Sequence, residues 1–287
     1  MKARFQVTLI APKNRVVLSN TNVLSEVACD DDPNLKVVQF GVTPIMSTYL
    51  LAFVIGEYEY IEKKTEKGTS VRVYTPIGKK EQGTFALETA ASCLTLFEDY
   101  FNVPYPLAKL DHIAIPDFAL GAMENWGLIT YRETRILADP KNTSTSAREM
   151  VAICVTHETA HQWFGNLVTM EWWTHLWLKE GFATFMEYLA TDRIYPDFDI
   201  WSQFVTSSTL VALKFDAMHN THKIEIPVGH PGEVESIFDD ISYNKGGAVI
   251  RMCHGWIGDE VRLNCQKMYS LKALIFHRHS ERACTTI

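Results

Sequence analysis

The chain has 287 residues, of which 47% are hydrophobic, a composition typical of a folded globular protein with one large domain or two smaller ones. Its formal net charge is −7 and it has no basic stripe, which argues against nucleic acid as a partner. No stretch approaches 18 consecutive apolar residues, so the sequence predicts no membrane-spanning helix.

The six cysteines are scattered and form no Cys-x-x-Cys pair, a pattern that favours reduced thiols over a disulfide framework. Polar residues interrupt the start of the chain, which therefore lacks the apolar core of a signal peptide. Together these features predict a cytoplasmic protein. The sequence gives no indication of its oligomeric state.

Residues 1–58 are predicted to form antiparallel β-structure. Apolar and polar residues alternate along residues 4–12, 15–19, 35–40 and 49–60, and turn-forming residues separate these segments. So few strands would leave exposed sheet edges. We therefore expect this region to be the C-terminal remnant of a larger β domain, followed by a second domain over residues 59–287.

The second predicted domain mixes strands with helices. Strand patterns occur at residues 71–74, 110–115 and 128–131, and apolar residues fall at helical spacing along residues 81–101 and 199–215. The fold class predicted for the whole chain is therefore α+β.

A glycine-bounded motif follows the strand predicted at residues 110–115. It runs from Gly121 to Gly127 and includes Ala122, Met123, Glu124 and Asn125. Glycine gives the backbone freedom to approach a ligand closely, and the acid could then bind that ligand. Taken alone the motif is weak evidence, because an acid beside glycine in a loop is usually just solvated.

The strongest chemical pattern is the pentad His157-Glu158-Thr159-Ala160-His161. Positions i and i+4 of a helix share one face, about 6 Å apart along the axis, so His157 and His161 can bind one metal ion. Glu158 can act on a metal-bound water as a general base without being a ligand. Eighteen residues separate His161 from Glu180, which lies in a second helical segment and can complete a two-His, one-Glu zinc site.

A capped amphipathic helix is predicted to carry this pentad. Ser146 and Glu149 match a Ser-x-x-Glu capping box, which would begin the helix there. An apolar face then leads into the pentad, formed by Met150, Val151, Cys154, Val155 and Thr156.

Two later segments hold further candidate residues. Tyr243 is predicted to lie just before a helix that starts near Asn244, a position where tyrosine is usually a packed or capping residue. His277 and His279 are two residues apart, which does not place both on one helical face. We therefore predict no second metal site in the C-terminal tail.

The glycine-bounded motif, the pentad and Glu180 together resemble the zinc-dependent aminopeptidases of the gluzincin class. The segments HQWFGNLVTMEWWTHLWL and VGHPGEVESIFDDISYNKG are similar to the puromycin-sensitive branch of that class. The resemblance extends from about residue 3 to about residue 258. It implies a thermolysin-like zinc-metallopeptidase domain preceded by a partial antiparallel β domain.

The resemblance also implies residue roles in hydrolysis. His157, His161 and Glu180 would ligate one zinc ion per chain. Glu158 would take a proton from the zinc-bound water and pass it to the leaving amine. Tyr243 would stabilise the oxyanion of the tetrahedral intermediate.

Substrate recognition is implied for the glycine-bounded motif. Glu124 would hold the free α-ammonium group of a peptide, which an internal peptide bond lacks. The motif residues around it would line the substrate, namely Gly121, Ala122, Met123 and Asn125.

Some features differ from the family pattern. Lys179 precedes the third ligand where the family usually has Asn, and Thr159 stands where Leu is common. The chain also begins inside the family's N-terminal β domain and stops before the helices of its zinc domain are complete, so we expect a truncated relative.

The sequence therefore predicts a zinc aminopeptidase that removes N-terminal residues from peptides. A truncated, non-catalytic paralogue that binds peptide or zinc is the alternative, and Lys179 favours it. An epoxide hydrolase of the same superfamily ranks below both, because that branch is less similar to the WFGNLVTMEWW segment.

Overall fold

The computed structural model describes residues 2–258. The chain divides into two compact units, one comprising Met1–Gln162 and Met186–Ile200 and the other Trp163–Phe185 and Trp201–Ile287. Strands gather at the N-terminal end and helices follow, so the predicted α+β class is confirmed. Within the described residues, no helix is long and apolar enough to cross a membrane.

The N-terminal β region of the first unit is antiparallel, as predicted. Its cluster of buried side chains includes Ala11, Val17, Val38 and Phe40. In one sheet, β5 (Leu35–Phe40) lies between β2 (Thr8–Pro12) and β4 (Val23–Ala28). Two further strand pairs are β3 (Val16–Ser19) with β7 (Phe53–Gly56), and β1 (Lys2–Ala3) with β6 (Met46–Ser47).

Two strand predictions in this region need correction, and one strand was missed. The strand predicted at residues 4–12 begins only at Thr8, and the one predicted at residues 49–60 begins only at Phe53 and is broken after Gly56. The pattern also missed β4, because all six of its residues are exposed and show no alternation between a buried and an exposed face. Backbone hydrogen bonds to β5 hold β4 in place instead.

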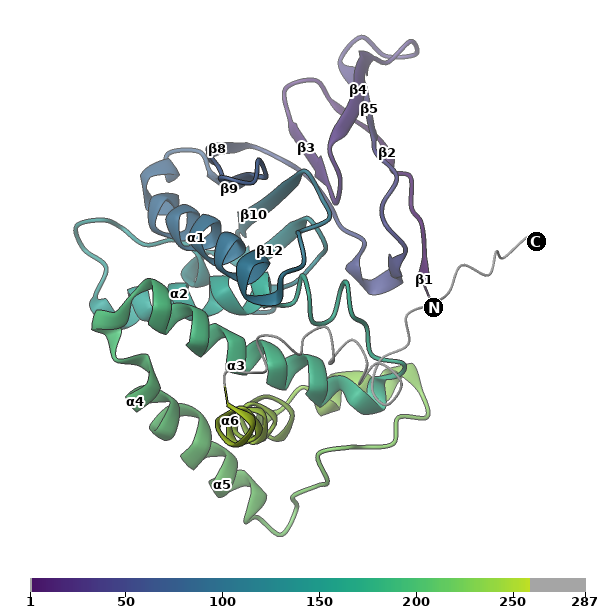
Figure 1. Cartoon of the computed structure of the whole chain (residues 1–287). Helices are drawn as coiled ribbons and strands as arrows, with labels where there is room; N and C mark the ends of the chain where they lie inside the picture. Colours follow the sequence, from purple (N-terminus) through teal and green to yellow (C-terminus); the bar gives the residue numbers. More distant parts are fainter. Residues whose placement is uncertain (1, 259–287) are drawn as a thin grey trace. The chain divides into compact units, whose positions relative to one another are not determined.

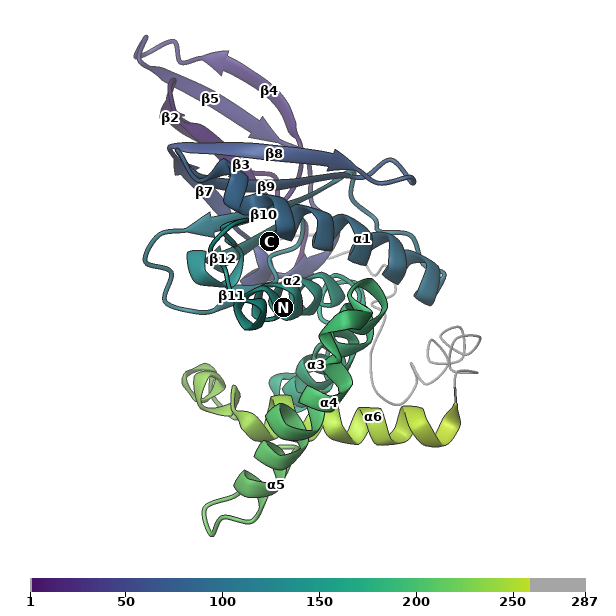
Figure 2. The ribbon, with the colours of Figure 1, turned by 90° about the vertical axis from the view of Figure 1, so that its left-hand side faces the viewer.

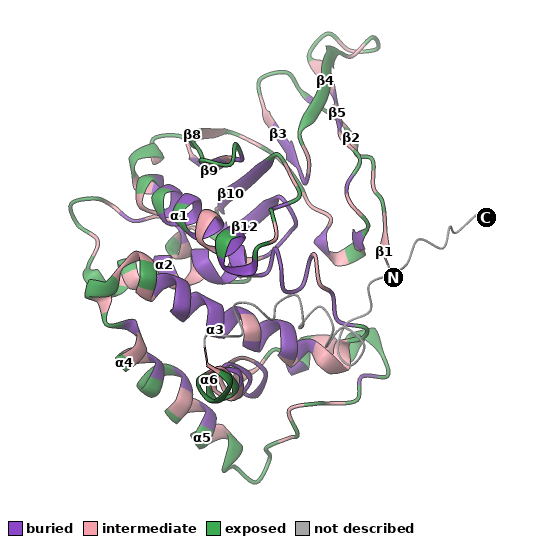
Figure 3. Cartoon of the chain, in the orientation of Figure 1, coloured by how far each residue is buried: buried purple, intermediate pink, exposed green. Residues whose placement is uncertain are grey.

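A five-stranded mixed sheet forms the centre of the first unit. Its central strand, β10 (Lys109–Ile115), runs parallel to both of its neighbours and is buried along nearly its whole length (Figure 3). The strand order is β11 (Ala122–Met123), β12 (Leu128–Arg132), β10, β9 (Ser70–Pro76) and β8 (Tyr58–Lys64), so β11 and β8 are the edges.

Helix α1 (Thr84–Phe101) covers this sheet, as Figures 1 and 2 show from two sides. It packs against β8 and β9 and also contacts α2 (Thr145–Ala160). Asn102, with a φ of 50°, follows its last turn in the left-handed conformation that ends many helices. The helix therefore agrees closely with the one predicted at residues 81–101.

The remaining helices lie wholly or partly in the second unit. They are α3 (Leu176–Ile194), whose last turns belong to the first unit, α4 (Ile200–Phe204), α5 (Leu210–Asp216) and α6 (Gly246–Ile257). A π-helical turn, Val205–Thr209, joins α4 to α5, so residues 200–216 are helical, close to the predicted 199–215. Gly181 and Gly246 let α3 and α6 approach closely, since a Cβ at Gly181 would lie 2.7 Å from the carbonyl carbon of Gly246.

The side chain of Phe97 tests the packing of α1. It is fully buried, and its ring centroid lies 5.6 Å from that of Phe101. We expect Phe97→Ala to lower the free energy of unfolding by about 3–5 kcal/mol, measured by chemical denaturation. Phe53→Ala is the matched control, because Phe53 is exposed and its loss should cost less than about 1 kcal/mol. Equal losses in the two variants would contradict the packing of α1.

Candidate metal centre

Helix α2 begins two residues earlier than the capping box predicted. Its N-cap is Ser144, whose Oγ accepts a hydrogen bond of 3.3 Å from the backbone N–H of Ala147. Ser146 lies inside the first turn, and Met150, predicted on the apolar face, is 46% exposed. Several neighbouring hydroxyl residues could each cap this helix, and the sequence pattern selected the wrong one.

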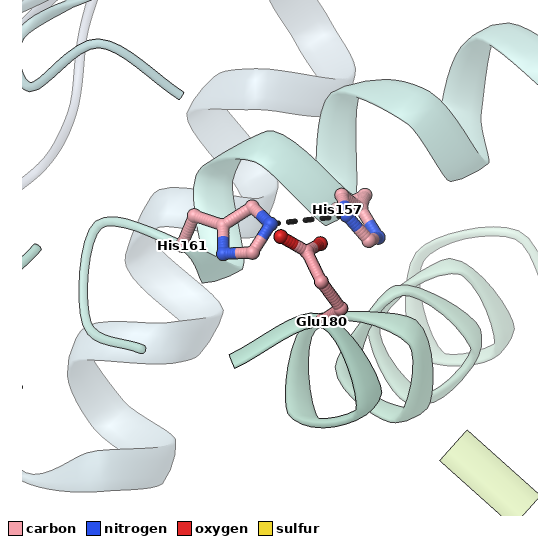
Figure 4. A group of neighbouring side chains, drawn as sticks. All are labelled: His157, His161 and Glu180. Atoms are coloured by element: carbon pink, nitrogen blue, oxygen red, sulfur yellow. Dashed lines mark hydrogen bonds between the residues drawn. The ribbon is translucent and has the colours of Figure 1, made fainter. Parts of the chain in front are cut away.

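The two histidines of the pentad lie together at the end of α2. His161 follows the last helical residue, but its N–H still donates to the carbonyl of His157 at 3.2 Å, so the helical spacing is kept. The two Nε2 atoms are 3.1 Å apart, as the dashed line in Figure 4 marks. Both residues are buried. The structure therefore confirms the prediction that His157 and His161 lie on one face of the helix.

Glu187 on α3 fixes the orientation of His157, and sequence reasoning missed it. Its Oε2 lies 2.5 Å from Nδ1 of His157. A carboxylate at this nitrogen keeps the proton on Nδ1, which leaves the lone pair of Nε2 available for a metal ion. The signal was present in the sequence, because Glu187 lies seven residues after Glu180 and so on the same face of α3.

Buried hydroxyl groups join α2 to the last turns of α3. Thr156 Oγ1 lies 3.1 Å from Thr191 Oγ1 and donates to the carbonyl of Glu187 at 3.3 Å. Glu180 lies two turns earlier on this continuous helix. His157, His161 and Glu180 form a group whose possible ligand atoms lie within 4.8 Å of one another (Figure 4).

The donor set suits zinc. Two imidazole nitrogens and one carboxylate, with a fourth position left for water, are the ligands of many catalytic zinc sites. Two nitrogens bound to one tetrahedral zinc ion lie about 3.3 Å apart, given Zn–N bonds of about 2.0–2.1 Å. The 3.1 Å separation of the two Nε2 atoms fits this value.

Glu158 and Glu124 bring two more buried acids to the same place. Together with His161 they form a second group of possible ligand atoms, again within 4.8 Å of one another. The phenol of Tyr49 donates to Glu124 Oε1 at 3.2 Å, and Tyr49 is another residue that the sequence did not reveal. Glu124 is only 4% exposed, so the reading of it as a solvated acid in a surface loop is wrong.

The glycine-bounded motif forms the edge of the sheet beside α2. Ala122 and Met123 make up the edge strand β11, which pairs antiparallel with β12 and contacts α2. The carbonyl of Gly121 accepts from the N–H of Arg132 at 2.9 Å, and Asn125 Oδ1 accepts from the hydroxyl of Thr130 at 3.1 Å. These bonds hold the backbone on both sides of Glu124.

Tyr131, on the neighbouring strand β12, supplies a neutral hydroxyl near the acids. Burial, and after it the charge of Glu158, raises the pKa of Tyr131 well above its usual range. Its hydroxyl lies 2.9 Å from Nδ1 of His112 on β10. Tyr131 therefore stays protonated at neutral pH.

Tyr243 belongs to the second unit and lies inside a helical segment. It is part of a π-helical turn, Ile241–Lys245, and not of a loop before a helix at Asn244. The sequence reading missed that Asp239 starts this turn, since its Oδ1 accepts from the N–H groups of Ile241 and Ser242 at 3.1 and 3.0 Å. His222 forms an ion pair with the other oxygen of Asp239 and ties the preceding loop to the turn.

Lys179 is buried beside Glu180. Its Nζ lies 2.7 Å from Glu180 Oε1, and each side chain is about 2% exposed. The departure from the family pattern at this position therefore places a cation next to a candidate ligand. His277 and His279, for which no second metal site was predicted, lie outside the described residues.

Comparison with known proteins identifies the family of this chain. A model of the peptidase family M1 domain matches residues 85–282, and a model of the peptidase M1 N-terminal domain matches residues 1–50. The chain belongs to peptidase family M1. The family membership inferred from the motifs is thereby confirmed.

Several relatives of this M1 chain are about half identical to it. Aminopeptidase M1-A of Oryza sativa subsp. japonica is 54% identical over 259 residues, which are 90% of this chain and 29% of the relative. Aminopeptidase M1 of Arabidopsis thaliana is 54% identical over 91% of the chain and 29% of its own length. Puromycin-sensitive aminopeptidase of Caenorhabditis elegans is 47% identical over 93% and 28%. The chain thus spans less than a third of the length of these relatives.

The cap of α2 can be tested by removing single hydroxyl groups. We expect Ser144→Ala to lower the free energy of unfolding by about 1 kcal/mol, because the N–H of Ala147 loses its acceptor. Ser146→Ala, within the first turn, should change it by less than about 0.5 kcal/mol. Thermal or chemical unfolding measures both. A larger loss at Ser146 would support the capping box that the sequence predicted.

Proposed function

We propose that this M1 chain forms the zinc-binding part of an aminopeptidase, which removes N-terminal residues from peptides. The observation that supports it best is a pair of buried groups that share His161, one with His157 and Glu180 and the other with Glu124 and Glu158. Burying several acids beside one another is costly unless cations neutralise them. A zinc ion and the ammonium group of a peptide N-terminus are two cations of the required kind.

His157, His161 and Glu180 would hold one zinc ion per chain. When bound, zinc lowers the pKa of a water molecule to about 7 and polarises a carbonyl group. Glu187 keeps the ring of His157 oriented and favours the proton on Nδ1, so the neutral ring presents the lone pair of Nε2 to a metal ion.

Glu158 is the proposed general base. It lies next to the ligand His157 in sequence, and one of its carboxylate oxygens is close to both Glu124 and His161. A buried carboxylate in this position can accept a proton from the attacking water and return it to the leaving amine. Such positioned acid–base catalysis contributes about 10²–10⁴ to the rate.

Glu124 is the proposed reader of the substrate N-terminus. Tyr49 orients its carboxylate, and the adjacent edge strand β11 offers backbone groups to an extended peptide. An ammonium group bound at Glu124 fixes how far the scissile bond lies from the chain end. This arrangement favours release of a single N-terminal residue.

Tyr243 is proposed to stabilise the oxyanion, a role that rests on the family resemblance. Its helical turn is held by Asp239 and, through it, by His222. A phenol donor at the developing negative charge adds about 3 kcal/mol of transition-state stabilisation in comparable sites.

A non-catalytic relative that binds zinc or peptide is the second candidate. The buried cation of Lys179 beside Glu180 favours it, since it opposes a metal ion at the same carboxylate. The domain boundary near residue 58 and the cytoplasmic location stay predictions.

Replacing Glu158 separates the two candidates. We expect Glu158→Ala to lower kcat on aminoacyl reporter substrates at least about 100-fold while zinc content stays stoichiometric. An N-acetylated reporter, which lacks the ammonium group, should be a poor substrate for the parent chain. Folded, zinc-loaded parent protein that binds peptide without turnover would favour the non-catalytic candidate. Equal cleavage with and without Glu158 would refute the proposed mechanism.

Glu187 can be tested through zinc affinity alone. We expect Glu187→Ala to weaken zinc binding about 10- to 100-fold in a chelator competition assay, because the ring of His157 loses its oriented proton acceptor. Thr191→Ala is the matched control, since Thr191 joins the same two helices but does not touch a histidine ligand. A comparable loss of zinc affinity in both variants would assign the effect to helix packing.

A further inference from the structure

Lys179 and Glu180 form a buried ion pair at a candidate metal ligand. The ammonium nitrogen lies 2.7 Å from Oε1 of Glu180, and both side chains are about 2% exposed. The two residues are neighbours on α3, which is tightly packed against α6 at Gly181 and Gly246.

The ammonium group of Lys179 contacts one oxygen of the Glu180 carboxylate, Oε1. Zinc would then have to share Glu180 with a fixed positive charge close by. Like charges repel strongly in a buried site, where the effective dielectric constant is low. Outer-shell groups that support zinc are usually carboxylates or carbonyls, which increase the basicity of a ligand. A lysine has the opposite electrostatic effect.

We infer that Lys179 is a positioning residue that neutralises Glu180 in the metal-free chain and weakens zinc binding at this site. The inference rests on the proposed function, because it takes Glu180 to be a zinc ligand. The ion pair then affects metal-free stability and zinc affinity in opposite directions. The ion pair stabilises the metal-free fold, since it offsets the charge of a buried carboxylate. The same pair lowers zinc affinity, since the ion must compete with the ammonium group for the carboxylate.

The test replaces Lys179 with methionine, which keeps most of its volume and removes its charge. We expect Lys179→Met to bind zinc about 10- to 100-fold more tightly than the parent chain in a chelator competition assay. Its metal-free melting temperature should fall, and the rise in melting temperature on adding zinc should increase. Lys179→Arg keeps the charge and should bind zinc no more tightly than the parent.

Lys109→Met is the matched control. Lys109 is also buried, and its Nζ lies 2.7 Å from Asp111 and from the carbonyls of Ser19 and Gly127. Loss of this pair should lower the melting temperature without tightening zinc binding, since none of these partners is a candidate ligand. If Lys179→Met does not fold, Lys179→Asn provides a second neutral variant, and it must show the tighter binding.

The outcomes distinguish this inference from the proposed function. Unchanged or weaker zinc binding in the neutral variants, with zinc still bound by the parent and lost in His161→Ala, overturns the role of Lys179 alone. Absence of zinc binding in the parent and in both neutral variants overturns the zinc site as well. Zinc binding by a neutral variant but not by the parent supports the inference in its strongest form.

Discussion

The contact between Glu187 and His157 joins the chemistry of the site to the packing of the fold. A carboxylate on α3 holds the ring of a histidine on α2, and the hydroxyl groups of Thr156 and Thr191 connect the same two helices. The position of Glu180 then follows from the continuity of α3, two turns away from Glu187. One interhelical contact thus favours one tautomer of the candidate ligand His157, and the helix that makes this contact carries the candidate ligand Glu180.

Charge burial is the main constraint on this arrangement. Glu124, Glu158, Glu180 and Glu187 are all buried, and each would destabilise the fold if its charge were left without a counterpart. Different groups serve the different acids. Glu187 has the Nδ1 proton of His157, Glu180 has Lys179, and Glu124 has the phenol of Tyr49. Buried carboxylates of this kind favour the binding of cations, because a cation offsets the cost of burying their charge.

Local patterns predicted those parts of the structure that depend on neighbouring residues. The spacing of apolar residues gave α1, the i, i+4 rule placed His157 and His161 on one face, and the alternation of residues 35–40 gave β5. Contacts between distant segments leave no such pattern. Tyr49 lies 75 residues from Glu124, and no periodicity links the two. The periodicity of α3 places Glu187 on the same face as Glu180, but the contact with His157, 30 residues away, depends on how the two helices pack. The prediction of the capping serine failed for another reason, because several neighbouring hydroxyl residues satisfy the same local rule.

Lys109 and Lys179 are both buried in ion pairs, but the two pairs have different consequences. Lys109 donates hydrogen bonds to Asp111 and to the backbone carbonyls of Ser19 and Gly127. These bonds connect the end of β3 to the central sheet. Lys179 pairs with an acid that is also the third member of a metal-ligand group. Any cation that binds Glu180 must therefore act against Lys179. With Glu180 as the proposed ligand, the charge of Lys179 therefore opposes metal affinity while it stabilises the metal-free fold.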